Sequence, residues 1–348
     1  MTSTVNTAKS ARTLAARTAA FALFGTLAFA SGSAEANKVK VKLGTLAPEG
    51  TVWHDVGLRI GQRWAEVDKG IELKIYPGGV VGDEGDMVRK MRIGQLHAAL
   101  ITGVGLGQIH RSAIALQVPM LIESWAELEY IRERVGPTIE KEMDAAGFIV
   151  LGWGDAGWVH QFSKVPAKTP DDFRKLKMFV WSGDPEAEKA WRAAKFNVVP
   201  LSVTDVLASL QTGMIESFGT TPLYAMTSNW YKTAKHMVKV NWSPLNGGIV
   251  ITKEQWEKID AGIRPKLMQI AREEGMNLRS DVQKLNESAI GSMKERGLTV
   301  VEADAALTAE WKKAAELAYP SIRGNVVPAP LFDEIQRLSK EFRAQPKK

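Results

Sequence analysis

The chain has 348 residues, of which 45% are hydrophobic and 24% are charged, with a formal net charge of +6 and no cysteine. This length and composition predict a folded protein of two domains, and they exclude disulfides, thiol catalysis and cysteine-based metal sites. Basic and acidic residues are interspersed along the chain, so the net charge does not indicate a nucleic-acid-binding protein.

The N-terminus has the layout of a secretory signal peptide. Three basic residues precede an apolar stretch over residues 18–30, and residues 33–36 (SAEA) offer a small-residue cleavage site. The apolar stretch is too short to span a bilayer. We therefore expect residues 1–36 to be a cleaved signal peptide and the mature protein to be periplasmic; an uncleaved anchor is the alternative.

Strands and helices alternate in the first part of the mature chain. We expect strands over 38–44, 71–76 and 97–102, and helices over 51–67 and 83–93. This order predicts a mainly parallel sheet covered by helices. Residues 125–146 follow as a helical segment that Pro137 should divide into two helices, and residues 148–153 as a buried strand.

A second alternating series follows this buried strand. Strands are expected over 177–181, 197–201, 214–218 and 247–252, and helices over 184–194 and 205–211. The remainder, residues 253–344, is predicted to be largely helical with a strand over 298–301. Two α/β series and a helical remainder predict an α/β protein of two lobes.

Motifs that would indicate an enzyme are absent from the sequence. There is no nucleophile elbow, P-loop or HExxH motif. The glycine-rich residues 103–107 lack the third glycine of a dinucleotide fingerprint, because Gln108 is there instead. We expect a loop whose backbone N–H groups face a ligand. The sequence therefore predicts neither an enzyme nor a site for a metal or cofactor.

Aromatic residues gather at the ends of predicted strands. Trp153, Trp158 and Trp181 end or follow strands, and this is where α/β folds place their ligands. Aromatic walls suit flat or apolar ligands. His160 lies among aromatic residues in WVHQF, where a half-buried structural histidine and a ligand contact are both open interpretations.

These residues belong to a longer pattern that resembles a known family. Residues 38 to about 340 resemble the extracytoplasmic solute-binding subunits of TRAP transporters, the DctP-like family. The resemblance rests on LGT (43–45), TVW (51–53), YPGG (76–79), MRIG (91–94), VPMLI (118–122), TPDDF (169–173), LKM (176–178) and ASLQTG (208–213).

The resemblance implies a two-lobe periplasmic-binding-protein fold with a ligand cleft between the lobes and a long connecting helix. It also implies delivery of a small-molecule ligand to TRAP membrane permease subunits. Lobe I is expected over residues 37–160 and about 247–285, and lobe II over residues 161–246 and about 286–340.

The chain departs from the family at the residues that bind carboxylates. Phe179 stands where the family has its carboxylate-binding arginine, and a second family arginine falls near His160. A phenyl ring cannot make the bidentate hydrogen bonds of a guanidinium group. The chain is similar to a subgroup that lacks this arginine and is associated with tetratricopeptide-repeat partner proteins, which implies an apolar pocket.

We therefore expect a solute-binding protein that holds an apolar or amphipathic small molecule in an aromatic cleft. The expected ligand-binding residues are Phe179, Trp181 and Phe218 in one wall, Trp153 and Trp158 near the hinge, His160, Thr220, Thr221 and Tyr224 as hydrogen-bonding groups, and Thr45, Trp53, Thr102 and Gly103 from the other lobe.

Two alternatives remain open at this point. The protein could bind an organic acid through a relocated clamp, for which Arg92, Arg111 and Lys164 are candidates. It could instead be a partner-binding or scaffold protein of the cell envelope that has lost solute binding.

Overall fold

In the computed structural model, which describes residues 38–346, one mixed sheet of nine strands joins two groups of helices. The strand order is β2-β1-β3-β8-β4-β7-β5-β6, and β9 pairs with β8. The predicted signal peptide, residues 1–36, lies outside the described residues.

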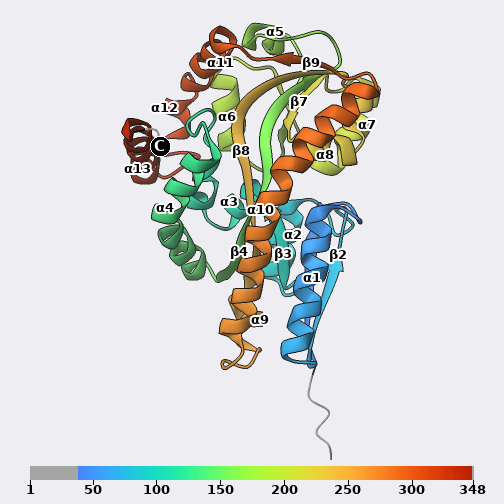
Figure 1. Cartoon of the computed structure of the whole chain (residues 1–348), viewed down its shortest axis with the longest axis vertical. Helices are drawn as coiled ribbons and strands as arrows, with labels where there is room; N and C mark the ends of the chain where they lie inside the picture. The colour runs from blue at the N-terminus through green and yellow to red at the C-terminus, as the bar shows by residue number, and fades with distance from the viewer. Residues whose placement is uncertain (1–37, 347–348) are drawn as a thin grey trace, which may run out of the picture. The chain divides into compact units, whose positions relative to one another are not determined.

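The first α/β series forms the part of the molecule that we call lobe I (Figure 1). Its elements are β1 (Val39–Thr45), α1 (Val52–Val67), β2 (Ile71–Tyr76), α2 (Glu84–Arg92), β3 (Ala98–Thr102), α3 (Gly103–Ile109) and the 3-10 helix η1 (Arg111–Gln117). Strand β1 pairs in parallel with β2 and β3, as the alternation predicts. The buried face of α1, which includes Val56, Ile60 and Trp64, belongs to the hydrophobic core of this lobe.

The second series forms lobe II, at the opposite end of the sheet. It contains α5 (Pro170–Arg174), β5 (Met178–Trp181), α6 (Pro185–Ala193), β6 (Val198–Leu201), η2 (Val203–Asp205), α7 (Val206–Thr212), β7 (Ser217–Thr220), α8 (Pro222–Thr227) and η3 (Trp230–Lys232). Strand β5 pairs in parallel with β6 and β7. The three strands and the helices α6 and α7 follow the predicted order, with strand β7 beginning three residues later than expected, whereas η2, α8 and η3 were not predicted.

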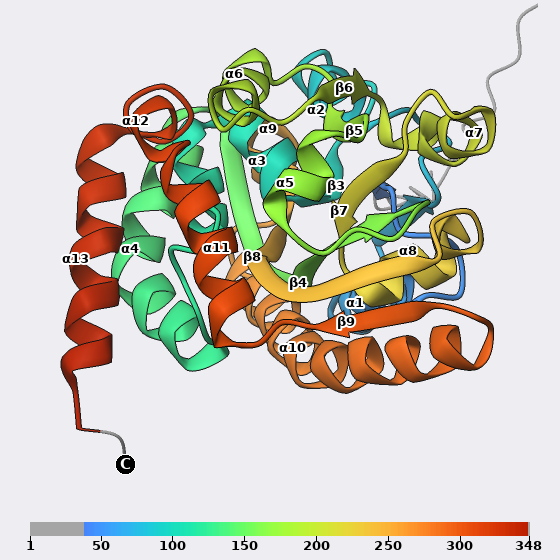
Figure 2. The same cartoon turned by 90° about the horizontal axis from the view of Figure 1, so that it is seen from above.

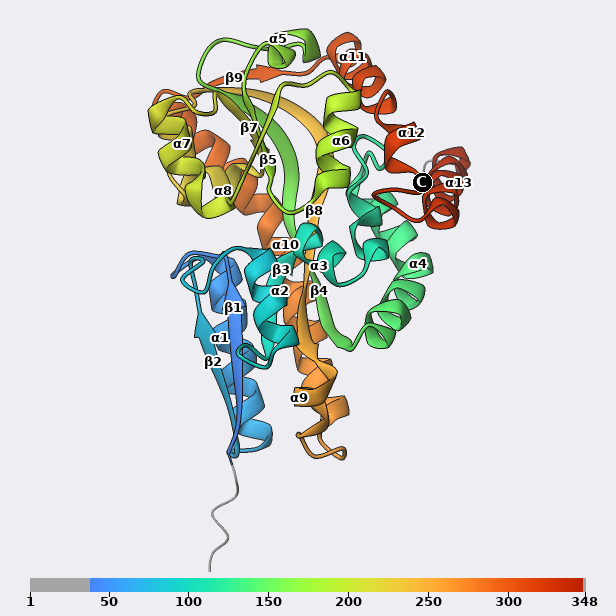
Figure 3. The ribbon, with the colours of Figure 1, turned by 180° about the vertical axis from the view of Figure 1, so that it is seen from behind.

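Two long antiparallel strands pass through both lobes (Figures 1 and 3). They are β4 (Phe148–Ser163) and β8 (His236–Thr252), which pair along most of their length; β8 also pairs with β3, and β4 with β7. The sequence predicted only residues 148–153 and 247–252 of them. The hydrophobic pattern breaks beyond these segments at Gly154, Gly157 and Pro244, where strand propensity is low.

Helix α4 (Trp125–Ala145) is a single helix, so the predicted division at Pro137 is wrong. Pro137 and Glu133, four residues earlier, are both exposed. The carbonyl group of Glu133, which loses its intrahelical N–H partner, can therefore bond to water, and the helix continues past the proline.

The C-terminal third is largely helical, as predicted. It contains α9 (Lys253–Glu257), α10 (Arg264–Glu295), β9 (Thr299–Glu302), α11 (Ala305–Glu316), α12 (Tyr319–Ile322) and α13 (Ala329–Ala344). The 32-residue helix α10 extends alongside both lobes, and Figure 2 shows it beside β9. Of the described helices, none combines the length and the apolar character needed to cross a membrane.

Candidate ligand-binding site

A cavity of about 280 Å³ is lined by residues of both lobes and of the long strands β4 and β8. Most of its lining is apolar. Trp53 comes from α1 in lobe I, Phe179 and Trp181 come from β5 in lobe II, and Trp153 comes from β4. The ring of Phe179 packs edge-on against Trp181, with ring centroids 6.1 Å apart. Such a lining suits a ligand with an apolar body.

The structure brings together eight of the thirteen residues expected to contact the ligand. Those that line the cavity are Thr45, Trp53, Thr102, Trp153, Phe179, Trp181, Thr220 and Tyr224. The five that do not line it are Gly103, Trp158, His160, Phe218 and Thr221.

The alternation of side chains along strand β4 explains why His160 and Trp158 do not line the cavity. Successive side chains of a strand point to opposite faces, and Val159 and Gln161 are the ones that line the cavity. The Nδ1 atom of His160 lies 2.8 Å from the carbonyl oxygen of Val240. Burial lowers the pKa of His160 to about 4, so this imidazole is neutral at physiological pH. Trp158 packs against a tryptophan of α4.

The other three residues lie in packed surroundings outside the cavity lining. Phe218 is fully buried and stacks on Phe162 with ring centroids 5.1 Å apart. Thr221 is fully buried where α8 begins. Gly103 provides space, because a Cβ atom there would lie 2.4 Å from the amide nitrogen of Gln117. Gln117 itself lines the cavity.

A buried carboxyl group that the sequence did not reveal lies in the same lining. Glu84 begins α2, and its carboxylate oxygens accept hydrogen bonds from the Thr102 backbone N–H, the Thr102 hydroxyl and the Gly105 N–H at 2.8, 2.8 and 2.9 Å. Burial raises the pKa of Glu84 to about 7 although these hydrogen bonds oppose the shift. The expected loop at residues 103–107 is thus wrong. These residues form helix α3, and the Gly105 N–H in its first turn donates to Glu84.

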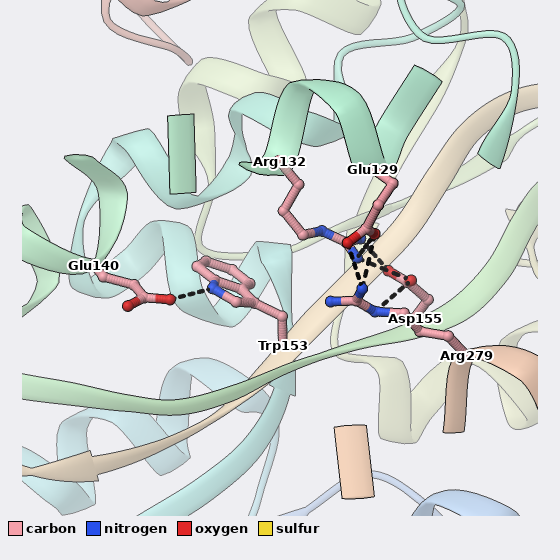
Figure 4. Close-up of polar contacts among 6 residues, drawn as sticks. All are labelled: Glu129, Arg132, Glu140, Trp153, Asp155 and Arg279. Carbon is pink, nitrogen blue, oxygen red and sulfur yellow. Dashed lines mark hydrogen bonds and ion pairs between the residues drawn. The ribbon is translucent and has the colours of Figure 1, made fainter. Parts of the chain in front are cut away.

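A cluster of two carboxylates and two guanidinium groups joins β4 to the helices α4 and α10 (Figure 4). Asp155 is buried between Arg132 of α4 and Arg279 of α10, with ion-pair distances of 2.5 and 3.4 Å. Glu129 completes the cluster through an ion pair of 2.7 Å with Arg279. Asp155 lines the cavity, but the two arginines compensate its charge.

Trp153 is held in place by a separate contact in the same view. Its indole N–H donates to the carboxylate of Glu140 on α4 at 2.8 Å, and Figure 4 shows the ring turned toward that residue. This hydrogen bond fixes the orientation of an aromatic ring of the cavity wall.

The three candidate clamp residues for an organic acid lie outside the cavity lining. Arg111 donates two hydrogen bonds of 2.8 Å to Asp184. The Lys164 ammonium group donates to the carbonyl oxygen of Leu210 at 2.8 Å, and Arg92 donates to a main-chain carbonyl of α3 at 3.0 Å.

Two polar contacts join the lobes near the cavity. The carboxylate of Asp83, at the start of α2, accepts hydrogen bonds from the Ser202 hydroxyl at 2.8 Å and from the Val203 N–H at 2.9 Å. The ion pair between Arg111 of η1 and Asp184 of lobe II is the second. The structure therefore has its lobes in contact around the cavity.

A family model described as bacterial extracellular solute-binding protein, family 7 (DctP), matches residues 43–324. The chain belongs to the DctP family. As a member of this family it is a periplasmic solute-binding protein of the TRAP type and not an enzyme, which confirms the predicted family and the predicted class of protein.

Relatives of this DctP-family protein match over most of its length. The solute-binding protein RD1_1052 of Roseobacter denitrificans is 25% identical over 315 residues, which are 88% of this chain and 95% of the relative. The C4-dicarboxylate-binding periplasmic protein DctP of Rhodobacter capsulatus is 23% identical over 249 residues, 71% of this chain and 73% of that protein.

A solved structure confirms the two-lobe α/β fold. A TRAP periplasmic solute-binding protein from Xanthobacter autotrophicus Py2, with bound β-D-galacturonate, has a TM-score of 0.80 at 17% identity and covers 86% of this chain and 99% of its own. A small-molecule ligand and TRAP permease partners fit the DctP family. The exact lobe boundaries and the tetratricopeptide-repeat association stay predictions.

Proposed function

We propose that this protein binds a neutral apolar or amphipathic small molecule in the aromatic cavity and delivers it to a TRAP permease. The observation that carries the proposal is the charge of the lining. Among residues 38–346, no lysine or arginine side chain lines the cavity, whereas Glu84, Asp155 and Asp184 do. The arginines that contact Asp155 and Asp184 are already paired with them, so a ligand carboxylate would be buried without a cation of its own, which costs several kcal/mol.

The intrinsic fluorescence of the cavity tryptophans offers a direct test. Trp53, Trp153 and Trp181 line the cavity, so a bound molecule should change their emission. We expect saturable binding of primary alkanols and no response to succinate or galacturonate. Tight binding of either acid, with no response to the alkanols, would overturn the proposal.

The organic-acid alternative is favoured by the acids bound to similar proteins of known structure, such as β-D-galacturonate in the Xanthobacter protein and succinate in a protein from Sulfurospirillum deleyianum. If a relocated cation held such an acid here, reversing the charge of Arg92, Arg111 or Lys164 one at a time should abolish acid binding in one of the three variants. Under our proposal none of these reversals removes an interaction with the ligand, although Arg111→Glu also breaks the ion pair with Asp184.

A scaffold role without solute binding is the remaining alternative. A cavity of about 280 Å³ with an apolar, aromatic lining supports solute binding instead, because a protein that had lost this role need not keep the space. Failure of every small-molecule probe to bind the purified protein would favour the scaffold role.

We further propose that residues 1–36 are removed on export and that the mature chain acts in the periplasm. N-terminal sequencing of the periplasmic protein should begin at Asn37, and an intact Met1 would contradict cleavage. The proposed tetratricopeptide-repeat partner rests on the subgroup resemblance alone, and co-purification of such a protein with this chain tests it.

A further inference from the structure

Two buried primary amides in the cavity lining have no hydrogen-bond partner among the described residues. Gln161 on β4 and Asn246 on β8 are each 1% exposed, and the amide nitrogen and oxygen of both side chains are unpaired. A buried polar group without a partner costs about 1–3 kcal/mol, so folded proteins rarely leave one. Because both residues line the cavity, a molecule in the cavity is their natural partner.

The local structure places both residues in closely packed positions of the cavity wall. Gln161 lies beside Gly219 of β7, where a Cβ atom would come within 3.3 Å of both amide atoms. At the other position, the main-chain carbonyl of Asn246 accepts a hydrogen bond from Gln117 at 2.7 Å. The protein thus holds the backbone of Asn246 in place and leaves its side-chain amide unused.

Two indole N–H groups add to this polar set. The Nε1 atoms of Trp53 and Trp181 are buried, have no partner among the described residues, and belong to side chains that line the cavity. An indole can only donate, whereas a primary amide donates two hydrogen bonds and also accepts. The set is therefore richer in donors than in acceptors, which calls for a ligand that carries oxygen acceptors.

The two amides are far apart along the sheet. Asn246 pairs with Asp155 on β4, and Gln161 comes six residues after Asp155. Six residues of a regular strand span about 20 Å, and two irregularities in the pairing shorten this distance. Between them, Ala156 and Val159 line the cavity with apolar groups. The cavity extends from α1 to α12, which lie on opposite sides of the molecule in Figures 1 and 3.

We propose that Gln161 and Asn246 bind the two polar ends of one elongated, uncharged molecule that carries oxygen acceptors on an apolar chain. This inference rests on the proposed function, because it assumes a neutral ligand. A carboxylate at either end would find no lysine or arginine among the described residues that line the cavity, and a buried carboxylate without a cation is costly.

The test uses α,ω-alkanediols, primary alkanols of the same chain lengths and the matching α,ω-dicarboxylates as probes, with calorimetric titration of the mature protein. The variants Gln161→Met and Asn246→Leu preserve side-chain volume and remove the amides. We expect each variant to weaken binding of the diol about tenfold. Because the alkanol has a single hydroxyl group, its affinity should decrease in only one of the two variants.

A matched control separates this effect from a general effect of replacing a buried glutamine. Gln255 on α9 is buried, donates to a carbonyl of β1 and does not line the cavity, so Gln255→Met should leave diol affinity unchanged. Thermal unfolding without probe adds a second readout. Loss of an unpaired amide should not lower Tm in Gln161→Met or Asn246→Leu, whereas a marked decrease in both would show that the amides serve the fold and would overturn the assignment.

The outcomes distinguish this inference from the function on which it rests. Diol binding that is unchanged in both variants overturns the assignment of the amides and leaves the neutral-ligand function standing. Failure of the diols to bind while the alkanols bind likewise overturns only the assignment of the amides. Tighter binding of the dicarboxylates than of the diols, or failure of every diol and alkanol to bind the wild-type protein, overturns the neutral-ligand function as well.

Discussion

Phe179 occupies a position in the cavity wall where a charge would be costly. Its ring is buried and packs edge-on against Trp181 and Trp230, with ring centroids 6.1 and 6.2 Å away. A guanidinium group there would be surrounded by aromatic carbon, and the cavity lining described here has no other cation that could share in binding a carboxylate.

We therefore expect Phe179→Arg to weaken alkanol binding at least about tenfold without creating tight binding of an organic acid. Fluorescence titration with an alkanol and with succinate measures both effects. Phe179→Leu is the control and should retain most of the alkanol affinity, because it keeps an apolar side chain. Tight succinate binding by the arginine variant would show that the rest of an acid site survives in this chain.

His160 gives the protein a defined acid sensitivity. Burial holds the pKa of His160 at about 4, while the unfolded chain protonates near 6.5. The unfolded chain therefore takes up this proton more readily than the folded protein. The contribution of His160 to the free energy of unfolding is fully present above pH 6.5 and is lost as the pH falls toward 4. At about pH 5 the loss should be about 2 kcal/mol.

Replacement of the imidazole by an amide, in His160→Gln, should remove about 2 kcal/mol of the difference in unfolding free energy between pH 8 and pH 5. Urea unfolding at the two pH values measures it. Glu84 titrates in the opposite direction, but its contribution is the same in both proteins and cancels. The control His236→Gln changes a half-buried histidine at the start of β8. An equal effect in both variants would argue against a special role of His160.

At the scale of elements, the close approach of α10 to β4 depends on glycine. A Cβ atom on Gly275 would lie 2.3 Å from the carbonyl oxygen of Trp153, and one on Gly152 would lie 2.8 Å from a carbonyl of α10. Backbone atoms cannot move aside as a flexible side chain can. These two positions set how near the long helix lies to the strand that lines the cavity.

Gly275→Ala should therefore destabilise the protein by about 1–3 kcal/mol, measured as the free energy of unfolding in urea. Gly291 lies in the same helix, and a methyl group at this position would meet no atom within 4 Å among the described residues. Gly291→Ala should consequently stabilise the protein by about 1 kcal/mol. If both alanine variants were stabilising, the packing of α10 on β4 would be looser than described.

Elements with a local pattern could be predicted from the sequence, and contacts between distant residues could not. The strand–helix alternation of both lobes follows from hydrophobic periodicity, which acts within about ten residues. Which side chains of β4 face the cavity depends on its pairing with β8. Irregularities in this pairing near Gly157 and Gln161 change the alternation of side chains between the two faces of the strand. The burial of Glu84 could not be predicted from the local sequence, because its hydrogen-bond partners Thr102 and Gly105 are about twenty residues away along the chain.

At the scale of the whole molecule, the cavity is bounded by both lobes and by contacts that join them. Asp83 of lobe I accepts hydrogen bonds from Ser202 and Val203 of lobe II, and Arg111 pairs with Asp184 across the same boundary. A ligand that fills the cavity is expected to favour this closed arrangement, since only the closed form surrounds it with both lobes.

The chemical nature of that ligand is the central claim, and native mass spectrometry of the protein purified from the periplasm tests it most directly. The account predicts a non-covalent mass above that of the mature chain. On release, the bound molecule should be uncharged and amphipathic, and an alkanediol should displace it. Release of a sugar acid or a dicarboxylate in its place would contradict the account.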